Sequence, residues 1–284
     1  MDAIRRTDRP VLRNPRALLA WEGWNDASDA ASGAIAFLLG QHEVEPFAVV
    51  EPEEFYDFRA SRPMVEIEEG GTRRLSWPAT RFYALKMPNS AHDVVVMIGN
   101  EPSLRWKTYT RLVAQVLTEA DVELAVTLGA FIGQVAHTVP VPLIGVATDP
   151  DLVIRHNLST SDYEGPTGVV GVMLEACREM GLPTLSLWAA VPHYLAANPN
   201  PKAMLALLQG AAGILEFEVD TAELTQVATE FTGRVDEAMA ENEAFVSYVQ
   251  RLEAESGTPI STVRSGDGDQ LITEIEQFLR NRDD

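Results

Sequence analysis

Polar and aromatic residues gather around the ends of several short apolar runs, and they are the residues with which this chain could do chemistry. The candidate set comprises Trp24, Asn25, Asp26, Asn100, Glu101, Gly129, Phe131, Gln134, Tyr163, Glu164, His193 and Tyr194. Because loops that follow parallel strands meet at one edge of a sheet, we expect this set to form a single site there. Aromatic and amide side chains on such loops suit either a small-ligand crevice or a contact with another protein.

Motifs for nucleophilic or metal chemistry are missing from the sequence. The five histidines show no HxH or HExxH spacing, and the single Cys177 cannot complete a zinc set. The sequence also lacks a G-x-S-x-G elbow for a serine nucleophile. A carboxylate pair across the sheet edge, formed by Glu22 or Asp26 with Glu101, is geometrically possible. A role as turn residues explains acidic side chains at these positions equally well. We therefore expect no metal, no cofactor and no catalytic residue.

Three glycines at a spacing of three precede or open a helix that the sequence predicts from Pro166 up to the stop at Gly181-Leu182-Pro183. They are Gly165, Gly168 and Gly171. The spacing differs from the dinucleotide fingerprint and no strand comes directly before it, so we interpret the glycines as positions of close helix packing. We expect Pro166 at the first helical position, with Asp162 and Glu164 supplying the negative charge that a helix amino end attracts.

The elements that must position the candidate set are short strands with apolar side chains on both faces. The central one covers residues 124–128, which are too few for a helix and stop at a glycine. Such a strand needs cover on both faces, as in a parallel sheet between helical layers. The other predicted core strands are 17–21, 93–98, 143–147 and 184–190. Since strands and helices alternate here, we predict a doubly wound, mostly parallel α/β sheet.

Composition shifts divide the chain into three predicted parts. Residues 1–16 form a polar, mobile leader, residues 17–219 an α/β core domain, and residues 220–284 an acidic helical subdomain. Within the core, the short β-type runs between 47 and 87 predict partly exposed strands and hairpins. The run 214–219 predicts an extended edge piece.

The predicted helical subdomain carries apolar residues at alternating steps of four and three. They are Leu224, Ala228, Phe231, Val235, Ala238, Asn242, Phe245, Val249 and Leu252. This stripe could pack on its own domain or on another chain, and Asn242 could instead cap a second helix. From residue 219 onward, fifteen acidic residues and five arginines give a net charge of −10, so we expect a strongly acidic exposed face.

The total net charge of −20 disfavours nucleic acid and anionic membranes as partners, because both are bound through Lys and Arg. No segment approaches the roughly 20 consecutive apolar residues that cross a bilayer. The first sixteen residues hold five arginines but no apolar core of a signal peptide. We expect a cytoplasmic protein that binds neither nucleic acid nor membranes.

At the candidate set the chain resembles the family of the second proteasome assembly chaperone, in its bacterial branch. The stretches that carry the resemblance are Gly23-Trp24-Asn25-Asp26-Ala27, Gly99-Asn100-Glu101-Pro102, Leu128-Gly129-Ala130, Tyr163-Glu164-Gly165-Pro166-Thr167-Gly168 and Trp188-Ala189-Ala190-Val191-Pro192-His193-Tyr194. The resemblance spans roughly residues 17–255. It implies a three-layer α/β/α core similar to nucleoside phosphorylases, followed by a helical carboxyl-terminal part.

The resemblance also implies a role as a non-catalytic oligomeric scaffold or assembly factor. We expect a homo-oligomer, with a trimer favoured, and a proteasome-related assembly as a further partner. Family members that dock on proteasome rings often end in a hydrophobic residue, a tyrosine and one final residue, whereas this chain ends Asn281-Arg282-Asp283-Asp284. The alternative is a phosphorylase-like or hydrolase-like enzyme, which predicts an enclosed pocket with perturbed carboxylates at the carboxyl edge of the sheet.

Overall fold

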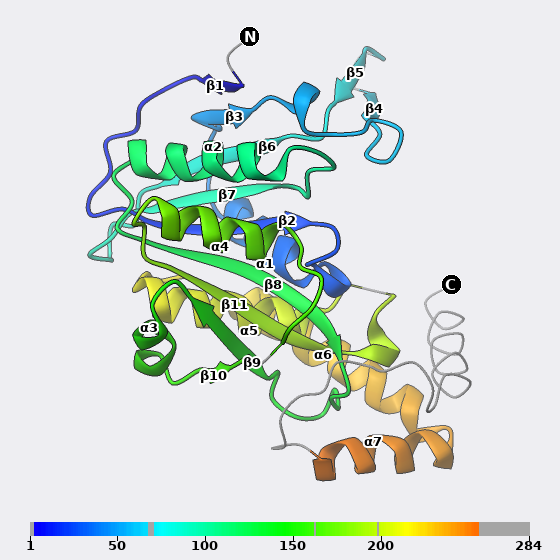
Figure 1. Ribbon diagram of the computed structural model, residues 1–284. Coiled ribbons are helices and arrows are strands. Elements are labelled where there is room, and N and C mark those ends of the chain that lie inside the picture. Colours follow the sequence, from blue (N-terminus) through cyan, green and yellow to red (C-terminus); the bar gives the residue numbers. More distant parts are fainter. Residues whose placement is uncertain (1–2, 68–70, 162, 198, 256–284) are drawn as a thin grey trace.

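A computed structural model describes residues 3–67, 71–161, 163–197 and 199–255, and one nine-stranded sheet forms its centre (Figure 1). The strands lie in the order β1-β3-β6-β7-β2-β8-β11-β9-β10. Their bounds are β1 Ile4–Arg6, β2 Arg16–Glu22, β3 Ala48–Val50, β6 Thr80–Leu85, β7 Val94–Asn100, β8 Leu124–Gly133, β9 Leu143–Ala147, β10 Ser159–Thr160 and β11 Thr184–Pro192. A separate two-stranded ribbon consists of β4 Met64–Ile67 and β5 Arg73–Ser76.

The middle of the sheet is parallel, as the apolar runs predict. β7, β2, β8 and β11 are neighbours and run in one direction, with Val126 opposite Leu18 on one side and Leu185 on the other. Antiparallel pairs flank this centre: β6 pairs with β7 and β3 with β6 on one side, and β9 pairs with β11 on the other. The edge strand β10 is parallel to β9. The prediction of a doubly wound, mostly parallel α/β fold is therefore confirmed, with β1, β10 and a short helix as unpredicted additions.

Helices cover both faces of the parallel centre. The α-helices are α1 Ala30–Gly40, α2 Trp106–Glu119, α3 Pro150–Arg155, α4 Val169–Glu179, α5 Pro201–Leu215, α6 Ala222–Ala240 and α7 Glu243–Glu255. Short 3-10 turns are η1 Ala27–Asp29, η2 Pro52–Glu54 and η3 His193–Leu195. β2 alternates between the layers: Leu18 and Ala20 pack with α1 and α5, whereas Leu19 and Trp21 pack with α2 and α4 (Figure 1). Its alternation makes both layers depend on one strand.

Several element boundaries differ from the predicted ones. β8 does not stop at Gly129 but continues to Gly133. Gly129 lies inside the strand because the ring of Trp188 packs against it, and a Cβ at this position would lie 2.5 Å from that ring. Ile214 and Leu215 are helical rather than extended, because both are buried against the core at the end of α5. The chain then leaves the helix through Glu216, whose φ of 51° is left-handed.

The start of α4 also differs. The helix begins at Val169, with Gly168 extended before it, so Pro166 does not occupy the first helical position. Gly168 is required there, because a Cβ would come within 2.0 Å of the Asn25 amide nitrogen. The close packing inferred for the glycines is therefore seen at Gly168, whereas the helix itself begins one turn later than expected.

The described part of the acidic subdomain is a pair of helices that packs on its own chain. α6 and α7 are separated at Asn242, whose Oδ1 accepts a hydrogen bond from the Ala244 N–H at 2.9 Å. The stripe is thus broken by a cap, which is the second alternative left open by the sequence. Val235, Phe245 and Val249 are buried in a cluster with η3, and Phe231 packs half-buried against it.

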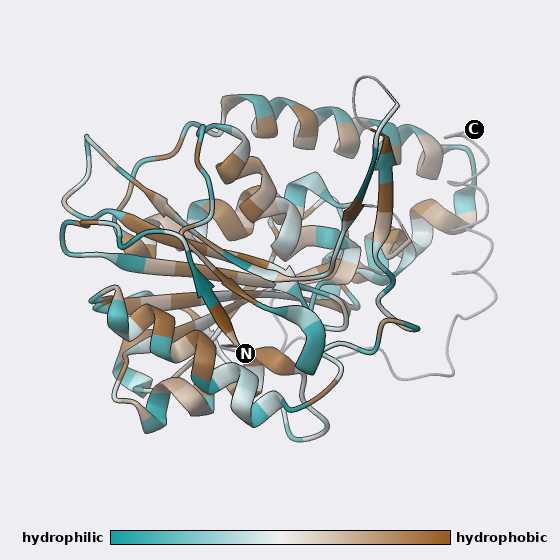
Figure 2. Cartoon of the chain, turned by 90° about the horizontal axis from the view of Figure 1, so that it is seen from above, coloured by the Kyte–Doolittle hydropathy of each residue, from teal (hydrophilic) through white to brown (hydrophobic). Residues whose placement is uncertain are grey.

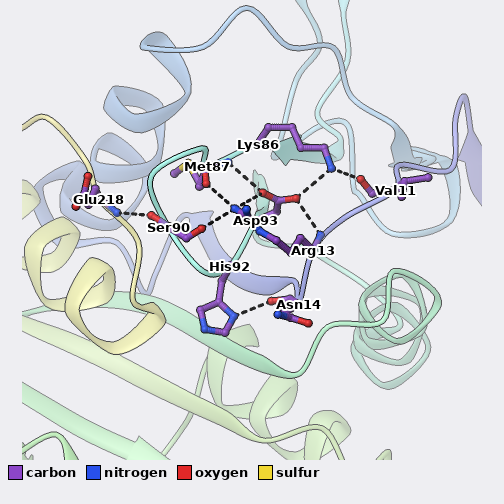
Figure 3. A network of polar contacts seen from close by, with 9 residues as sticks. All are labelled: Val11, Arg13, Asn14, Lys86, Met87, Ser90, His92, Asp93 and Glu218. Atoms are coloured by element: carbon purple, nitrogen blue, oxygen red, sulfur yellow. Dashed lines mark hydrogen bonds and ion pairs between the residues drawn. The ribbon is translucent and has the colours of Figure 1, made fainter.

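Asp93 joins the segments at the amino-terminal ends of the parallel strands β2 and β7 (Figure 3). Its carboxylate accepts hydrogen bonds from the backbone N–H groups of Arg13 and Met87 and from the Lys86 ammonium. Burial alone would raise the pKa of Asp93, but these three donors lower it below its usual value. The Arg13 guanidinium also donates to the Met87 carbonyl at 2.8 Å, so the segment before β2 is fixed to the turn between β6 and β7.

Val126 tests the parallel centre. It is fully buried in β8, so Val126→Ala should lower the free energy of unfolding by about 1–3 kcal/mol through lost burial and a cavity. Val11→Ala is the control because Val11 is 86% exposed, and its effect should stay within about 0.5 kcal/mol. Urea titration measures both, and equal midpoints for Val126→Ala and the parent would contradict the core assignment.

Candidate functional site

Glu101 connects the loops that follow β2 and β7 to the beginning of α4. Its Oε1 accepts a hydrogen bond from the Asn25 side-chain amide at 3.0 Å and another from the Val169 N–H at 2.8 Å. The Glu101 N–H donates to the Glu22 carbonyl at 2.8 Å. Glu101 therefore supplies the negative charge at the amino end of α4, a role that we expected from Glu164 and from Asp162, which lies outside the described residues. We call the described segments 22–29, 100–104, 161 and 163–168 the rim.

Asn25 and Asp26 are structural parts of the rim. The Asn25 carbonyl accepts from the Ala130 N–H at 2.8 Å, which ties the loop after β2 to β8. The Asp26 Oδ1 accepts from the N–H groups of Ala31 and Ser32 at 2.6 and 3.2 Å and so caps the start of α1. Burial raises the pKa of Asp26 against the lowering effect of these hydrogen bonds. Both side chains are buried and face away from solvent.

A chain of hydroxyl groups lies beneath the rim. The Trp21 indole N–H donates to the Tyr109 hydroxyl at 2.8 Å, and that hydroxyl lies 2.5 Å from the Thr80 Oγ1. The Tyr56 hydroxyl donates to the Asn100 carbonyl at 2.9 Å, which connects this layer to the end of β7. Complete burial raises the pKa of Tyr109 well above its usual value, so the phenol stays neutral. The rim thus stands on a closed and uncharged polar support.

The outer surface of the rim is aromatic and acidic. Trp24 is 64% exposed, and Tyr163 is exposed with its hydroxyl donating to the Pro166 carbonyl at 2.9 Å. Glu22 and Glu164 are exposed as well, and Glu22 accepts from the Asn100 side-chain amide at 2.6 Å. The predicted meeting of the loops after β2 and β7 with the 163–168 segment is therefore seen in the structure.

The remaining candidates lie elsewhere. Gly129 and Phe131 are within β8, and Gln134 follows it directly. His193 and Tyr194 are buried in η3 and turn toward the helical subdomain. Seven of the twelve candidates therefore lie in the rim, and three lie in β8 or directly after it. The last two belong to a second cluster, because η3 folds back beneath the sheet edge instead of facing outward.

This second cluster, which we call the clasp, consists of His137, His193, Tyr194, Asp236 and Tyr248. The Tyr194 hydroxyl accepts from the His137 N–H at 2.9 Å and lies 2.7 Å from His137 Nδ1, while His137 Nε2 lies 3.0 Å from Asp236 Oδ1. One tautomer satisfies all three contacts, with Nε2–H donating to Asp236 and Nδ1 accepting from Tyr194. In the same way, His193 Nδ1–H donates to the Gly133 carbonyl and Nε2 accepts from the Tyr248 hydroxyl at 2.7 Å.

The clasp therefore joins the end of β8, η3, α6 and α7. Burial lowers the pKa of both His137 and His193, and the nearby Asp236 carboxylate opposes that effect only at His137. Sequence reasoning missed His137, Asp236 and Tyr248, because their contacts join positions far apart in the chain. Tyr248 directly precedes Val249 of the apolar stripe but is not part of it, and nothing in its spacing paired it with a histidine.

Two cavities formed by the described residues lie away from the rim: one lies between the loop after β8, α5 and α6, and the other lies beside the end of α5. In the same residues there is no group of three His, Cys, Asp or Glu side chains placed to hold a metal ion. A search of the described helices for one long and apolar enough to span a bilayer found none.

A family model described as the PAC2 family matches residues 20–239, which include the end of β2, the rim, the clasp histidines and nearly all of α6. The chain belongs to the PAC2 family. A crystal structure of a PAC2 family protein from Streptomyces avermitilis MA is 42% identical, with a TM-score of 0.78 over 83% of this chain and 100% of the other. The resemblance seen in the sequence is thus confirmed.

Other solved structures fit the same assignment. A proteasome-assembly chaperone homologue from Mycobacterium tuberculosis is 39% identical, with a TM-score of 0.76 over 82% of this chain and 99% of the other. PbaB from Pyrococcus furiosus, described as an archaeal proteasome activator, is 19% identical and shares the fold at a TM-score of 0.63, over 82% of this chain and 97% of the other. A search of curated proteins found no match.

Glu101 provides a direct test of the rim. Glu101→Ala leaves the Asn25 amide and the Val169 N–H without their acceptor, so it should lower the free energy of unfolding by about 1–3 kcal/mol. Glu164→Ala removes an exposed glutamate from the same rim and should change the free energy of unfolding by less than about 0.5 kcal/mol. Guanidinium titration compares the two, and a larger loss for Glu164→Ala would refute the role given to Glu101.

His193 makes the clasp sensitive to pH. Because its pKa is lowered in the folded chain, its contribution to stability is complete above the unfolded pKa of about 6.5 and is lost as the pH falls toward the folded value. The melting temperature should therefore fall between about pH 7.5 and about pH 5.5, and His193→Asn should flatten that slope. His42→Asn, in the loop after α1, should leave the slope unchanged. A parent and a His193→Asn variant with identical slopes would rule this out.

Proposed function

We propose that this PAC2 family protein is a non-catalytic, assembly-chaperone-like module that works as a homo-oligomer, with a trimer favoured, in the cytoplasm. The observation that carries the proposal is the exposed aromatic rim on a rigid support. Trp24 and Tyr163 stand out from loops in which the Asn25 amide, the Asn100 carbonyl and the Glu101 carboxylate are engaged in hydrogen bonds within the chain. Rigid, exposed aromatic residues are typical of surfaces that bury against another protein.

The enzyme alternative finds less support in the same region. It requires an enclosed pocket in which carboxylates converge, whereas Asp26 caps a helix and Glu101 is occupied by two N–H donors. The two cavities noted among the described residues lie away from the rim. A chaperone-like role also agrees with the description of the Mycobacterium tuberculosis relative as a proteasome-assembly chaperone homologue.

The acidic helices offer a second surface, suited to a basic partner such as a proteasome-related assembly. Their apolar stripe faces the clasp, so Glu237 and Glu241 lie exposed on α6 and just beyond its end. Exposed carboxylates contribute little to stability but can steer an oppositely charged protein. We therefore assign self-association to the apolar surfaces and partner selection to this acidic face.

The proposal is tested by sedimentation velocity of the purified full chain together with pull-down mass spectrometry. A closed oligomer, rather than a monomer, is expected at micromolar concentration. Reversing Glu237 and Glu241 to Lys should leave the melting temperature within a few degrees of the parent and weaken capture of a basic partner, more strongly at low salt.

The matched control reverses Glu43 and Glu45, two exposed glutamates in the loop after α1, and so changes the net charge equally. Capture should survive in this control. A monomeric parent protein would contradict the proposed homo-oligomer. Equal loss of capture in both double variants would contradict the role proposed for the acidic face.

A further inference from the structure

α7 packs on the rest of the chain through one small apolar cluster. Its inward face consists of Phe245, Tyr248, Val249 and Leu252, which are all buried. They meet residues from the loop after β8, from η3 and from the second half of α6: Ala136, Tyr194, Leu195, Val235 and Met239. In Figure 1, α7 (orange) lies beyond the end of α6, at the opposite side of the molecule from α2. No later described element depends on α7 for its position.

The cluster beneath α7 is separate from the two large clusters on the faces of the sheet. Those two combine the sheet, whose central strands are coloured as hydrophobic in Figure 2, with the helices α1 to α5. α6 is divided: Leu224 belongs to the cluster with α1 and α5, whereas Val235 and Met239 pack with α7. Regions with separate apolar clusters open in separate steps, at free energies below that of complete unfolding. The packing therefore allows α7 to leave while the sheet stays folded.

His193 has one ring nitrogen that accepts a hydrogen bond, and that nitrogen faces α7. Its Nδ1–H donates to the Gly133 carbonyl at 3.3 Å, and its Nε2 accepts from the Tyr248 hydroxyl at 2.7 Å. A proton on Nε2 turns the acceptor into a second donor, so the Tyr248 hydroxyl loses its acceptor. Since His193 is only 4% exposed, the new positive charge would also be buried. When α7 leaves, water reaches Nε2 and hydrates the charge, so a proton on His193 favours the released form.

The groups that face His193 offer little compensation for a positive charge. The rings of Tyr194 and Tyr248 stand edge-on to it, with centroids at 5.2 and 5.7 Å, and both phenols are neutral. On α7, the Arg251 guanidinium lies over the Tyr248 ring, and Arg251 and Glu255 act in opposite senses on the pKa of Tyr248. Burial lowers the pKa of His193, and the Gly133 carbonyl opposes that effect only in part.

The charged side chains of the clasp act on His137 instead. Asp236 Oδ1 lies 3.0 Å from its Nε2, and Asp236 and Glu253 both raise the pKa of His137, whereas Lys202 and burial lower it. A positive charge on His137 would therefore be balanced by a neighbouring carboxylate. Of the two buried histidines, His193 is the one whose protonation conflicts with the packed state of α7.

We propose that α7 is a pH-operated latch. Protonation of His193 releases α7 from η3 and from the second half of α6, while the sheet and the first half of α6 stay folded. Release uncovers the apolar surface of Leu195, Val235 and Met239. The proton comes from the solvent and stays on Nε2 until α7 closes again. The latch goes beyond the chaperone-like role and does not rest on it, because it acts within a single chain.

Hydrogen exchange of the full chain, measured by mass spectrometry, tests the local release. Protection factors are corrected for the pH dependence of chemical exchange and compared at about pH 7.5 and about pH 5.5. An exposed histidine has a pKa of about 6.5, so the released form should gain up to about tenfold at the lower pH. Peptides of α7 should lose protection by up to that factor. They should also be less protected than peptides of β8 at both pH values, with little dependence on urea.

Two results would overturn the latch in this experiment. Protection of α7 that equals that of β8 at both pH values would mean that α7 opens only when the whole protein unfolds. Protection of α7 that is the same at both pH values would mean that no proton is coupled to its release.

Substitutions identify the group that takes up the proton. His193→Gln keeps an acceptor for Tyr248 but does not titrate, so the loss of α7 protection at low pH should disappear. His42→Gln, in the loop after α1, is the matched control and should keep the loss. Tyr248→Phe removes the hydroxyl that faces Nε2 and should lower α7 protection already at about pH 7.5. A His193→Gln variant with the parent's pH response, or a Tyr248→Phe variant with the parent's protection, would exclude His193 as the sensor.

A cross-link gives a second readout that keeps the clasp intact. The Thr138 hydroxyl donates to the Glu253 carboxylate, so these positions lie side by side in the loop after β8 and in α7. Thr138→Cys with Glu253→Cys, joined by a short bismaleimide, ties α7 down. The native Cys177 is fully buried, and burial raises its pKa to about 11, so it stays unreactive. The pH response of α7 should vanish in the cross-linked chain and persist in the same variant without the cross-linker. A cross-linked chain that keeps the response would contradict release.

Discussion

The Glu101 carboxylate is the point at which three distant segments of the chain become one surface. It accepts from the side chain of Asn25 and from the N–H of Val169, and its own N–H is held by the Glu22 carbonyl. These contacts require the ends of β2 and β7 to lie side by side and α4 to begin directly above them. Gly168 permits this approach, because any side chain there would collide with Asn25. The shape of the rim, and the outward direction of its aromatic residues, follow from that junction.

Much of the fold could be predicted because burial on both faces leaves a clear trace in sequence. The run at 124–128 and its neighbours are apolar without alternation, which only a covered strand explains. β10 and α3 were missed because elements of two and six residues carry too little periodicity to be recognised. Ile214 looked extended because β-branched and aromatic residues follow it, yet burial against the core keeps it in α5.

The site was predictable only to the extent that strand ends meet at an edge. That rule brought Asn25, Asn100 and Glu101 together correctly. It failed for His193, since a 3-10 turn after β11 reverses the side chain into the protein. No sequence pattern indicates such a reversal, nor that Tyr248, 55 positions later, supplies the hydrogen bond. The positions of the strand ends could be predicted because they follow from a local sequence pattern. The polar contacts of the clasp could not, because they join residues that only the tertiary fold brings together.

The central place of β2 has a consequence for how the chain is made. β2 is the first long strand to leave the ribosome, but its partners are β7 and β8, and the latter ends only at Gly133. At a synthesis rate of about 5–20 residues per second, a segment that is apolar on both faces waits roughly ten seconds without its neighbours. A nascent chain in that interval exposes unpaired backbone groups and side chains that aggregate readily. The order of synthesis thus leaves β2 open to contact with other chains until β7 and β8 have been made.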